Sequence, residues 1–261
     1  MNWDVKYIVS SIRAKVDIRI VRKSKLDSFR QYAKDTETLL SLPTATLNKL
    51  VSLIPRSKAQ LRQDLFVLSE LNFKNNGYFI EFGATNGIDL SNTFLLEKEF
   101  GWRGILAEPA RCWHDALMAN RANSAIDTRC VWRDSSSIIS FNEANIAELS
   151  TISRYTAVDH HGDVRRNGRS YDVVTVSLID LCRQHNAPRE IDYLSIDTEG
   201  SEYDILKDFD FDEYRFNVIT CEHAYKPVKK RRNIYELLIG KGYVRKYVGL
   251  SHFDDWYVRS K

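Results

Sequence analysis

The segment GYFIEFGATNG, residues 77–87, joins a short apolar strand to a turn that contains two glycines. The strand covers residues 78–82, and the chain then passes through Gly83 and Gly87 into the helical segment IDLSNTFLLEKEF. A strand, a glycine turn and a helix in this order are typical of the nucleotide-binding unit of doubly wound α/β sheets. We expect Gly83 to let a ligand approach the backbone and Gly87 to let the following helix pack close to the strand.

The turn lacks one feature of dinucleotide-binding turns. Their fingerprint has a second glycine two residues after the first, whereas Thr85 stands at that position here. The next apolar strand, residues 102–107, ends at Glu108, about 20 residues beyond Gly87, where an acidic side chain accepts hydrogen bonds from both ribose hydroxyls. The pattern therefore favours a ribose-containing ligand and disfavours a pyrophosphate.

Glu81 and Glu108 end consecutive expected strands, so we expect both carboxylates at the same edge of a sheet. The alternative is that both are structural carboxylates that form salt bridges with Arg103 or Arg111 and bind no ligand. Their joint position in register favours the ligand site.

Size and charge limit the classes of protein. The chain has 261 residues, which is enough for one large α/β domain and a short additional segment. Its 38 basic and 35 acidic residues give a net charge of +3, which is too even to indicate a nucleic acid as the main partner.

The cysteines and the hydropathy pattern indicate the cellular compartment of the protein. Cys112, Cys130, Cys182 and Cys221 lie far apart in the sequence, so they indicate neither a disulfide framework nor a zinc site and fit a reducing cytoplasm. No apolar run approaches the roughly 20 residues that span a bilayer, and no signal-peptide core is evident. We expect a soluble, cytoplasmic protein.

Residues 1–56 are expected to form a helical extension. Ile8, Ile12 and Val16 share one helix face, and basic residues surround it. In one interpretation this helix packs on the main domain or on a second copy of the chain in a homo-oligomer. In the other it contacts a membrane surface or an anionic partner.

Residues 57–261 alternate between strand and helix patterns, which predicts a parallel sheet with right-handed crossovers. The chain ends in two alternating segments, 242–250 and 254–260, that are close enough to pair antiparallel. Residues 143–170 are polar and basic and interrupt the alternation, so we expect a lid or an acceptor-binding loop there. The expected strands before the last two are 78–82, 103–108, 126–132, 138–141, 171–178, 191–196 and 216–221.

Four motifs, EFGATNG, LAEP, IDYLSIDTEGSEYDIL and VITCEH, together resemble the FkbM-type methyltransferases over roughly residues 57–258. The resemblance implies S-adenosylmethionine as the cofactor and a Rossmann-like class I methyltransferase fold. That α/β fold has a mostly parallel seven-stranded sheet with an antiparallel C-terminal strand. Residues 1–56 lie outside the resemblance.

The resemblance also implies which residues bind the cofactor. Asp197 would face its amino group or sulfonium, and Glu108 would hold the ribose hydroxyls. A turn with carboxylates suits such a doubly cationic ligand better than it suits phosphates. The residues implied to wrap the methionine moiety are Glu81, Gly83, Ala84, Asn86 and Gly87. Those implied beside the adenosine are Pro109, Arg111, Trp132 and Asp134.

Candidate catalytic residues follow the later strands. Asp197, Glu199, Glu222 and His223 are expected at the same sheet edge as the cofactor. Methyl transfer is an in-line displacement, so positioning of the acceptor supplies much of the acceleration. We expect His223 to remove the acceptor proton, with Glu222 or Glu199 orienting it.

Other interpretations use the same residues differently. Asp197, Glu222 and His223 would also suit a divalent metal that holds the acceptor oxygen. His223 can equally be a hydrogen-bonded histidine without a chemical role. His160 and His161 form a second candidate set, on a lid that closes over the acceptor.

The expected function is transfer of a methyl group to a hydroxyl of a sugar or glycan, such as a polysaccharide, a lipid-linked glycan or a glycosylated metabolite. Carboxylates and a histidine suit a polyhydroxylated acceptor. One alternative is an N-methyltransferase or a small-molecule O-methyltransferase outside carbohydrate chemistry. Another is a nucleotide-binding module without catalysis.

Overall fold

The computed structural model describes residues 33, 36–37, 46–157, 161–223 and 228–260. The expected N-terminal helix with Ile8, Ile12 and Val16 lies outside these residues, and so does His160. Within the described part of the chain, every helix is too short or too polar to cross a bilayer.

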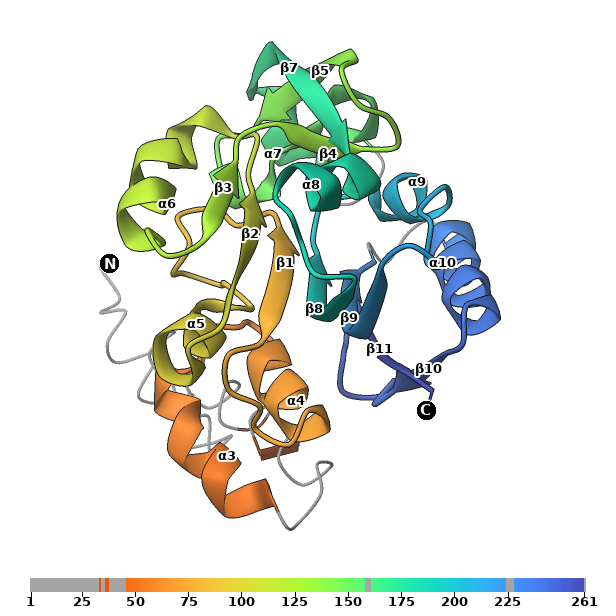
Figure 1. Cartoon of the computed structure of the whole chain (residues 1–261). Coiled ribbons are helices and arrows are strands. Elements are labelled where there is room, and N and C mark those ends of the chain that lie inside the picture. Colours follow the sequence, from red (N-terminus) through yellow and green to blue (C-terminus); the bar gives the residue numbers. More distant parts are fainter. Residues whose placement is uncertain (1–32, 34–35, 38–45, 158–160, 224–227, 261) are drawn as a thin grey trace, which may run out of the picture.

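Seven strands of the described chain form one twisted sheet (Figure 1). β1, β2, β3, β8 and β9 pair in parallel, whereas β11 is antiparallel to both of its neighbours. This confirms the predicted mostly parallel sheet with an antiparallel C-terminal strand. In spatial order the strands are β10 (Tyr243–Lys246), β11 (Asp254–Arg259), β9 (Arg215–Glu222), β8 (Glu190–Ile196), β1 (Tyr78–Phe82), β2 (Arg103–Ala107) and β3 (Ala125–Asp127).

A second, four-stranded sheet lies beside the first and corrects two predictions. It consists of β4 (Cys130–Trp132), β7 (Arg169–Ser177), β5 (Ile138–Glu143) and β6 (Thr151–Ile152). The single strand predicted over 126–132 is split between the sheets, because the Asp127 carboxylate accepts bonds from the backbone and side chain of Arg129 and turns the chain. The strand predicted at 171–178 belongs to the second sheet. Alternate residues of its first half are exposed, as in a sheet with one solvated face.

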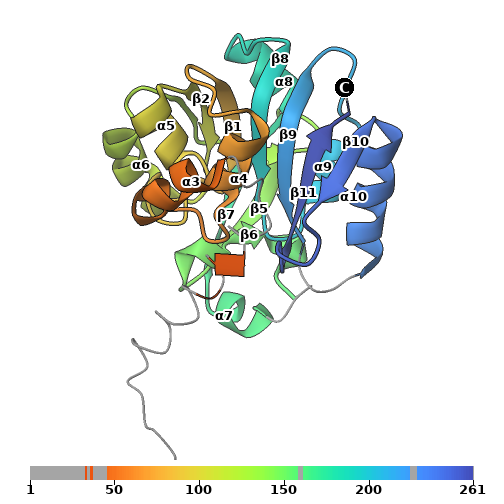
Figure 2. The ribbon, with the colours of Figure 1, turned by 90° about the horizontal axis from the view of Figure 1, so that it is seen from below.

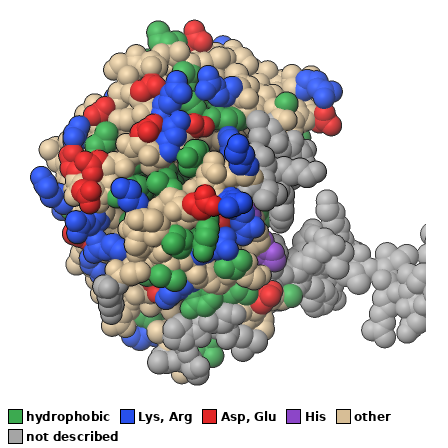
Figure 3. All heavy atoms as spheres, turned by 90° about the vertical axis from the view of Figure 1, so that its right-hand side faces the viewer, with side chains coloured by type: hydrophobic (Ala, Val, Ile, Leu, Met, Phe, Trp, Pro, Cys, Tyr) green, Lys and Arg blue, Asp and Glu red, His purple; other side chains and the backbone are tan. Residues whose placement is uncertain are grey.

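Helices cover both faces of the large sheet (Figure 2). Successive strand residues point to opposite faces, so Phe79 joins one apolar cluster and Ile80 the other. On the Phe79 face pack α3 (Leu47–Leu53), α4 (Gln63–Glu70), α5 (Phe94–Phe100) and α6 (His114–Asn120). On the Ile80 face pack α8 (Leu178–Gln184), α9 (Glu202–Leu206) and α10 (Val228–Gly240). The outer side of α9 and α10 mixes basic and acidic side chains (Figure 3).

The two turn glycines are required by close packing within the protein. Gly83 has φ +71, and a Cβ there would lie 2.2 Å from the backbone oxygen of Asp197 on the neighbouring strand. Gly87 has φ +78, and its Cβ would lie 2.6 Å from Cγ of Arg121. Gly83 is therefore required for the close approach of the turn after β1 to the residue after β8, and it also lines the pocket.

A buried arginine fixes the shape of the connection between β1 and α5. Arg121 follows α6 and is fully buried. Its Nε donates to Glu97 at 2.8 Å, its Nη2 to Thr93 Oγ1 at 2.9 Å, and its Nη1 to the oxygen of Gly87 at 2.9 Å and to Ser91 Oγ at 3.2 Å. Removing one partner from such a network leaves a buried charge uncompensated.

We predict that Arg121→Met lowers the free energy of unfolding by about 3–5 kcal/mol, because Glu97 loses its buried partner. Urea denaturation followed by circular dichroism measures this loss. The control is Arg103→Met at the exposed start of β2, which should change stability by less than about 0.5 kcal/mol. Equal losses in both variants would contradict the role given to Arg121.

Candidate active site

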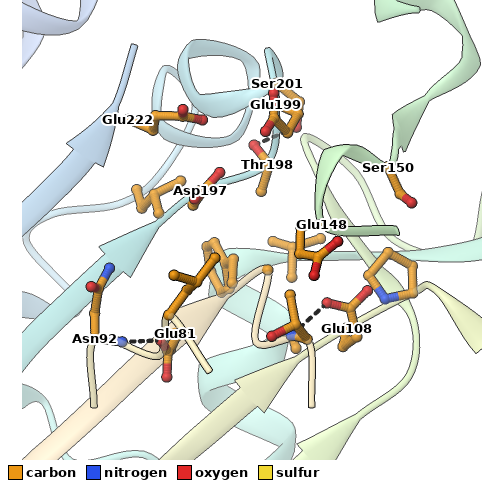
Figure 4. Close-up of a pocket in the computed structure, with 18 of the residues that line it drawn as sticks. Glu81, Asn92, Glu108, Glu148, Ser150, Asp197, Thr198, Glu199, Ser201 and Glu222 are labelled. Carbon is orange, nitrogen blue, oxygen red and sulfur yellow. Dashed lines mark hydrogen bonds between the residues drawn. The ribbon is translucent and has the colours of Figure 1, made fainter. Parts of the chain in front are cut away.

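A pocket opens beyond the carboxyl ends of β1, β2, β8 and β9, between the two sheets (Figure 4). It encloses about 1030 Å³, a volume that includes the space open to solvent at its mouth. Residues from the turn after β1, the end of β2, the second sheet and the loop after β8 line it. The position is the one in which open α/β sheets bind ligands.

Glu81 lines the pocket, but its carboxylate mainly holds the loop before α5. It accepts bonds from the backbone N–H of Asn92 at 2.7 Å, from Ser91 Oγ at 3.0 Å and from Thr93 Oγ1. Burial raises the pKa of Glu81, and the Arg121 guanidinium at 3.9 Å acts in the opposite direction. The alternative prediction paired Glu81 with Arg103 or Arg111, but the arginine beside Glu81 is Arg121.

Glu108 has unused capacity to accept hydrogen bonds. Its Oε2 accepts from the backbone N–H of Thr85 at 2.9 Å and its Oε1 from that of Ala110 at 2.8 Å. A carboxylate offers about four acceptor positions, so each oxygen can take a further bond from a ligand. Burial raises the pKa of Glu108 to about 7.

An apolar wall lies next to Glu108. Pro109 follows it directly, and the second sheet contributes most of the other apolar side chains. The sequence pattern did not reveal this contribution, since nothing in it places the second sheet against the end of β2. The apolar residues of this wall are Pro109, Cys130, Val131, Phe141 and Ile152.

Two residues expected beside the adenosine have other contacts. Trp132 is buried, with its ring 6.1 Å from that of Tyr155. Arg111 lies over the Tyr171 ring at 4.1 Å and donates to the backbone oxygen of Asp172.

An acidic group occupies the other side of the pocket. Carboxylate oxygens of Asp197, Glu199 and Glu222 lie within 4.8 Å of one another. The side chains of Asp197 and Glu222 thus lie close together. Desolvation within the pocket and the Asp197 charge raise the pKa of Glu222 well above its ordinary value. Desolvation also raises the pKa of Asp197, although its side chain is exposed to the open pocket. The pair therefore retains a proton where isolated carboxyls have lost theirs.

The segment expected to be a lid contacts this acidic group. It contains η4 (Ala147–Leu149), β6, η5 (Ser153–Tyr155) and α7 (Gly162–Arg166). Arg165 of α7 is fully buried and donates to Glu199 Oε2 and to the oxygen of Leu149, each at 2.6 Å. The Tyr155 hydroxyl donates to Asp204 at 2.6 Å. These bonds tie the segment to the loop and helix that follow β8.

His223 does not line the pocket. Its side chain is 5% exposed, its Nε2 is 3.8 Å from Asp255 Oδ1, and neither ring nitrogen has a hydrogen-bond partner among the described residues. Burial lowers its pKa. The carboxylate oxygens that the structure brings together are those of Asp197, Glu199 and Glu222, and His223 is not among them.

The site residues predicted from the sequence fall into two groups, those that line the pocket and those that do not. Those that line the pocket are Glu81, Gly83, Glu108, Pro109, Asp197, Glu199 and Glu222. Those outside its lining are Ala84, Asn86, Gly87, Arg111, Trp132, Asp134 and His223. His161 also lies outside, at the start of α7. Asn86 lies outside the lining because its side chain bonds Asp89 and the backbone of Ile88 within the turn.

The strand order and the pocket at the strand ends define an α/β methyltransferase fold. A family model described as the methyltransferase FkbM domain matches residues 81–254, which is more than half of the chain. The chain belongs to this family, and membership implies S-adenosylmethionine as its cofactor. No curated protein matches the chain.

Among solved structures, the methyltransferase domain of METTL16 is 10% identical over 76% of this chain, with a TM-score of 0.43. This chain covers 66% of that domain. A putative RNA methyltransferase from Pyrococcus horikoshii is 12% identical over 75% of this chain and 79% of that one, with a TM-score of 0.36.

The raised pKa values predict how stability depends on pH. A carboxyl with a higher pKa in the folded than in the unfolded chain binds more protons when folded, so its contribution falls as the pH rises through the window between the two values. Burial raises the pKa of Asp254 to about 8, and Glu222 is shifted in the same direction. His223, with its lowered pKa, acts in the opposite direction below its ordinary value.

We therefore predict that Glu222→Gln unfolds at the same temperature as the wild type near pH 5 and at a higher temperature near pH 8. Calorimetric unfolding across this range measures the difference between the two proteins, in which the contributions of other groups largely cancel. Parallel curves for the two proteins would show that Glu222 has an ordinary pKa.

Proposed function

We propose that this protein transfers a methyl group from S-adenosylmethionine to a hydroxyl of a sugar or glycan. The observation that carries the proposal is one pocket with Glu108 on one side and, on the other, the carboxyls of Asp197 and Glu222 within 4.8 Å of each other. The side with Glu108 suits a nucleoside. The side with Asp197 and Glu222 suits a cationic centre and can accept the proton of the acceptor.

The pocket residues fit the cofactor in three respects. The open acceptor positions of Glu108 suit the two ribose hydroxyls, and the apolar wall suits the adenine ring. The turn at Gly83 and Thr85 borders the space for the methionine moiety. Asp197 lies on the acidic side, where a carboxylate stabilises positive charge on a sulfonium or an ammonium group.

When bound, S-adenosylmethionine supplies a methyl group on a positively charged sulfur. The pocket residues would position the acceptor hydroxyl for in-line attack, which supplies much of the acceleration of a displacement. One carboxylate of Glu222 or Asp197 would accept the single hydroxyl proton as the carbon–oxygen bond forms and the carbon–sulfur bond breaks, so that a neutral ether and S-adenosylhomocysteine remain. Glu222 is better placed for this than His223, because it lines the pocket.

A divalent metal is the alternative aid to catalysis. Asp197, Glu199 and Glu222 offer three carboxylates to such an ion. However, the Arg165 guanidinium already bonds Glu199 and offsets part of the rise in the pKa of Asp197, so the acidic group contains a cation of the protein's own. We propose that transfer proceeds without metal; activity that is lost with a chelator and restored by Mg²⁺ would instead support the metal mechanism.

A cytoplasmic site of action also belongs to the proposal. Cys112, Cys130, Cys182 and Cys221 are all free thiols in the structure. Free cysteines are typical of reducing compartments.

We predict that Glu108→Ala weakens the binding of S-adenosylhomocysteine by about 10- to 100-fold, because the ribose loses hydrogen bonds to a charged group. Isothermal titration calorimetry measures the affinity. The control is Glu99→Ala on α5, which removes a glutamate outside the pocket and should leave the affinity unchanged. If wild-type protein shows no binding, the proposed function fails.

We predict that Glu222→Gln lowers kcat by about 100-fold or more, as expected for loss of a general base. His223→Gln should retain most of the activity. Incorporation of tritiated methyl into a panel of methyl glycosides and simple amines measures both. The reverse order of the two variants would assign the base to His223, and incorporation into amines alone would establish N-methyl transfer.

A further inference from the structure

Away from Glu108, residues at the starts of α4 and β11 line the pocket. Asn92 and Glu108 lie on opposite sides of the pocket (Figure 4). The residues that line this part of the pocket, called here the acceptor subsite, are Gln60, Gln63, Leu90, Asn92, Phe253 and Asp254. Gln60 and Gln63 precede the segment that matches the FkbM family, and Asp254 is the last residue of that match.

The register of the sheet places the acceptor subsite beside the acidic pair. Asp254 is the partner of Glu222 where β11 meets β9 antiparallel, so the two side chains lie on the same face of the sheet. Gln63 reaches this face from the start of α4 and donates to Asp254 Oδ2 at 3.0 Å. A backbone bridge between Ala59 and Leu90 closes the side of the subsite.

Asp254 presents an oxygen without a partner. Its side chain is 3% exposed, and its Oδ2 accepts from Gln63 Nε2 and from Trp256 Nε1, at 3.0 and 3.1 Å. Its Oδ1 is buried and has no hydrogen-bond partner in the described chain. Buried polar atoms are nearly always hydrogen-bonded, so this oxygen indicates a missing ligand group.

Asn92 presents a second such oxygen. Its amide nitrogen donates to Ser195 Oγ at 2.9 Å, and its Oδ1 is buried without a partner in the described chain. An amide oxygen can only accept a hydrogen bond, so its ligand must donate one. The Asp254 carboxyl can accept or, when protonated, donate. A hydroxyl group satisfies both residues.

The charge of the pocket excludes one class of acceptor. No lysine, arginine or histidine is among the lining residues of the described chain. The acidic lining residues are Glu81, Glu108, Glu148, Asp197, Glu199, Glu222 and Asp254. A phosphate or carboxylate in this space would lie beside several carboxyl groups, and no lining residue in the described ranges supplies a cation to it, because Arg165 is already bonded to Glu199.

We propose that the acceptor subsite binds a neutral, hydroxyl-bearing ring, with one hydroxyl on Asp254 and one on Asn92, and that Gln63 positions Asp254. Leu90 and Phe253 provide apolar contact for the C–H face of the ring. The inference rests on the proposed function and narrows it, because it excludes phosphorylated sugars and nucleic acid as acceptors.

The test uses full-length protein saturated with S-adenosylhomocysteine. Ligand-detected NMR titrations measure its affinity for methyl glucoside, methyl rhamnoside, glucosamine and glucose 6-phosphate. We expect at least one neutral glycoside to bind, and glucose 6-phosphate to bind at least about tenfold more weakly. Absence of binding by both neutral glycosides, or tighter binding of glucose 6-phosphate or glucosamine, would overturn the inference.

Variants of Asp254 and Asn92 test whether the neutral glycoside binds in the acceptor subsite. Asp254→Asn should weaken the binding of the neutral glycoside by about tenfold or more and leave the affinity for S-adenosylhomocysteine unchanged, since it keeps the acceptor for Gln63 and Trp256. The matched control is Asp64→Asn, the same change at a buried aspartate of α4 that does not line the pocket. It should leave both affinities within about twofold. If Asp254→Asn does not fold, Asn92→Ala replaces it, with the same expected loss.

The outcomes separate the two proposals. Failure of the wild type to bind S-adenosylhomocysteine would remove the proposed function. Normal binding of S-adenosylhomocysteine, together with unchanged glycoside affinity in Asp254→Asn or in Asn92→Ala, would remove the acceptor subsite alone.

Discussion

The structure of the site depends on one buried cation, the guanidinium of Arg121. It bonds Glu97, Thr93 and the backbone of Gly87, and it lies near the Glu81 carboxylate. Because a buried guanidinium requires its partners, the chain from the glycine turn to the start of α5 has little freedom to rearrange. That chain carries Glu81 and borders the pocket. The contacts of Arg121, which takes no part in the proposed chemistry, therefore fix the turn after β1 that borders the proposed cofactor site.

In contrast to the buried cation beneath the turn, the pocket itself is lined by acidic side chains. Several carboxylates gather there, and the cation bonded to Glu199, Arg165, belongs to the segment that covers the loop after β8. Burial raises the pKa of these carboxylates, so the ligand-free protein holds protons that a cationic cofactor can replace. The same arrangement disfavours anionic acceptors. In the proposed mechanism, a single electrostatic feature underlies cofactor binding, proton removal and the choice of acceptor.

Sequence patterns predicted the large sheet well and the second sheet poorly. The strands that include Phe79 and Leu194 are apolar, short and separated by helical segments, a pattern with few topological solutions. The strand that includes Val131 is equally short and apolar, yet it forms part of a separate sheet together with the longer, half-exposed strand that includes Val173. Local composition reports that a strand forms, not which strand it will pair with. The apolar wall of the pocket depends on that pairing and was therefore not predicted.

The sequence by itself determined the fold class, the family motifs and the carboxylates at the strand ends, because parallel strands bring their carboxyl ends to one edge. Only the tertiary structure decided which side chains enter the pocket. His223 and Glu222 are adjacent in sequence but point to opposite sides of a strand end, so just one lines the pocket. Gln63 and Asp254 are distant in sequence and meet because α4 packs over β11. Side-chain direction and long-range packing are properties of the folded chain.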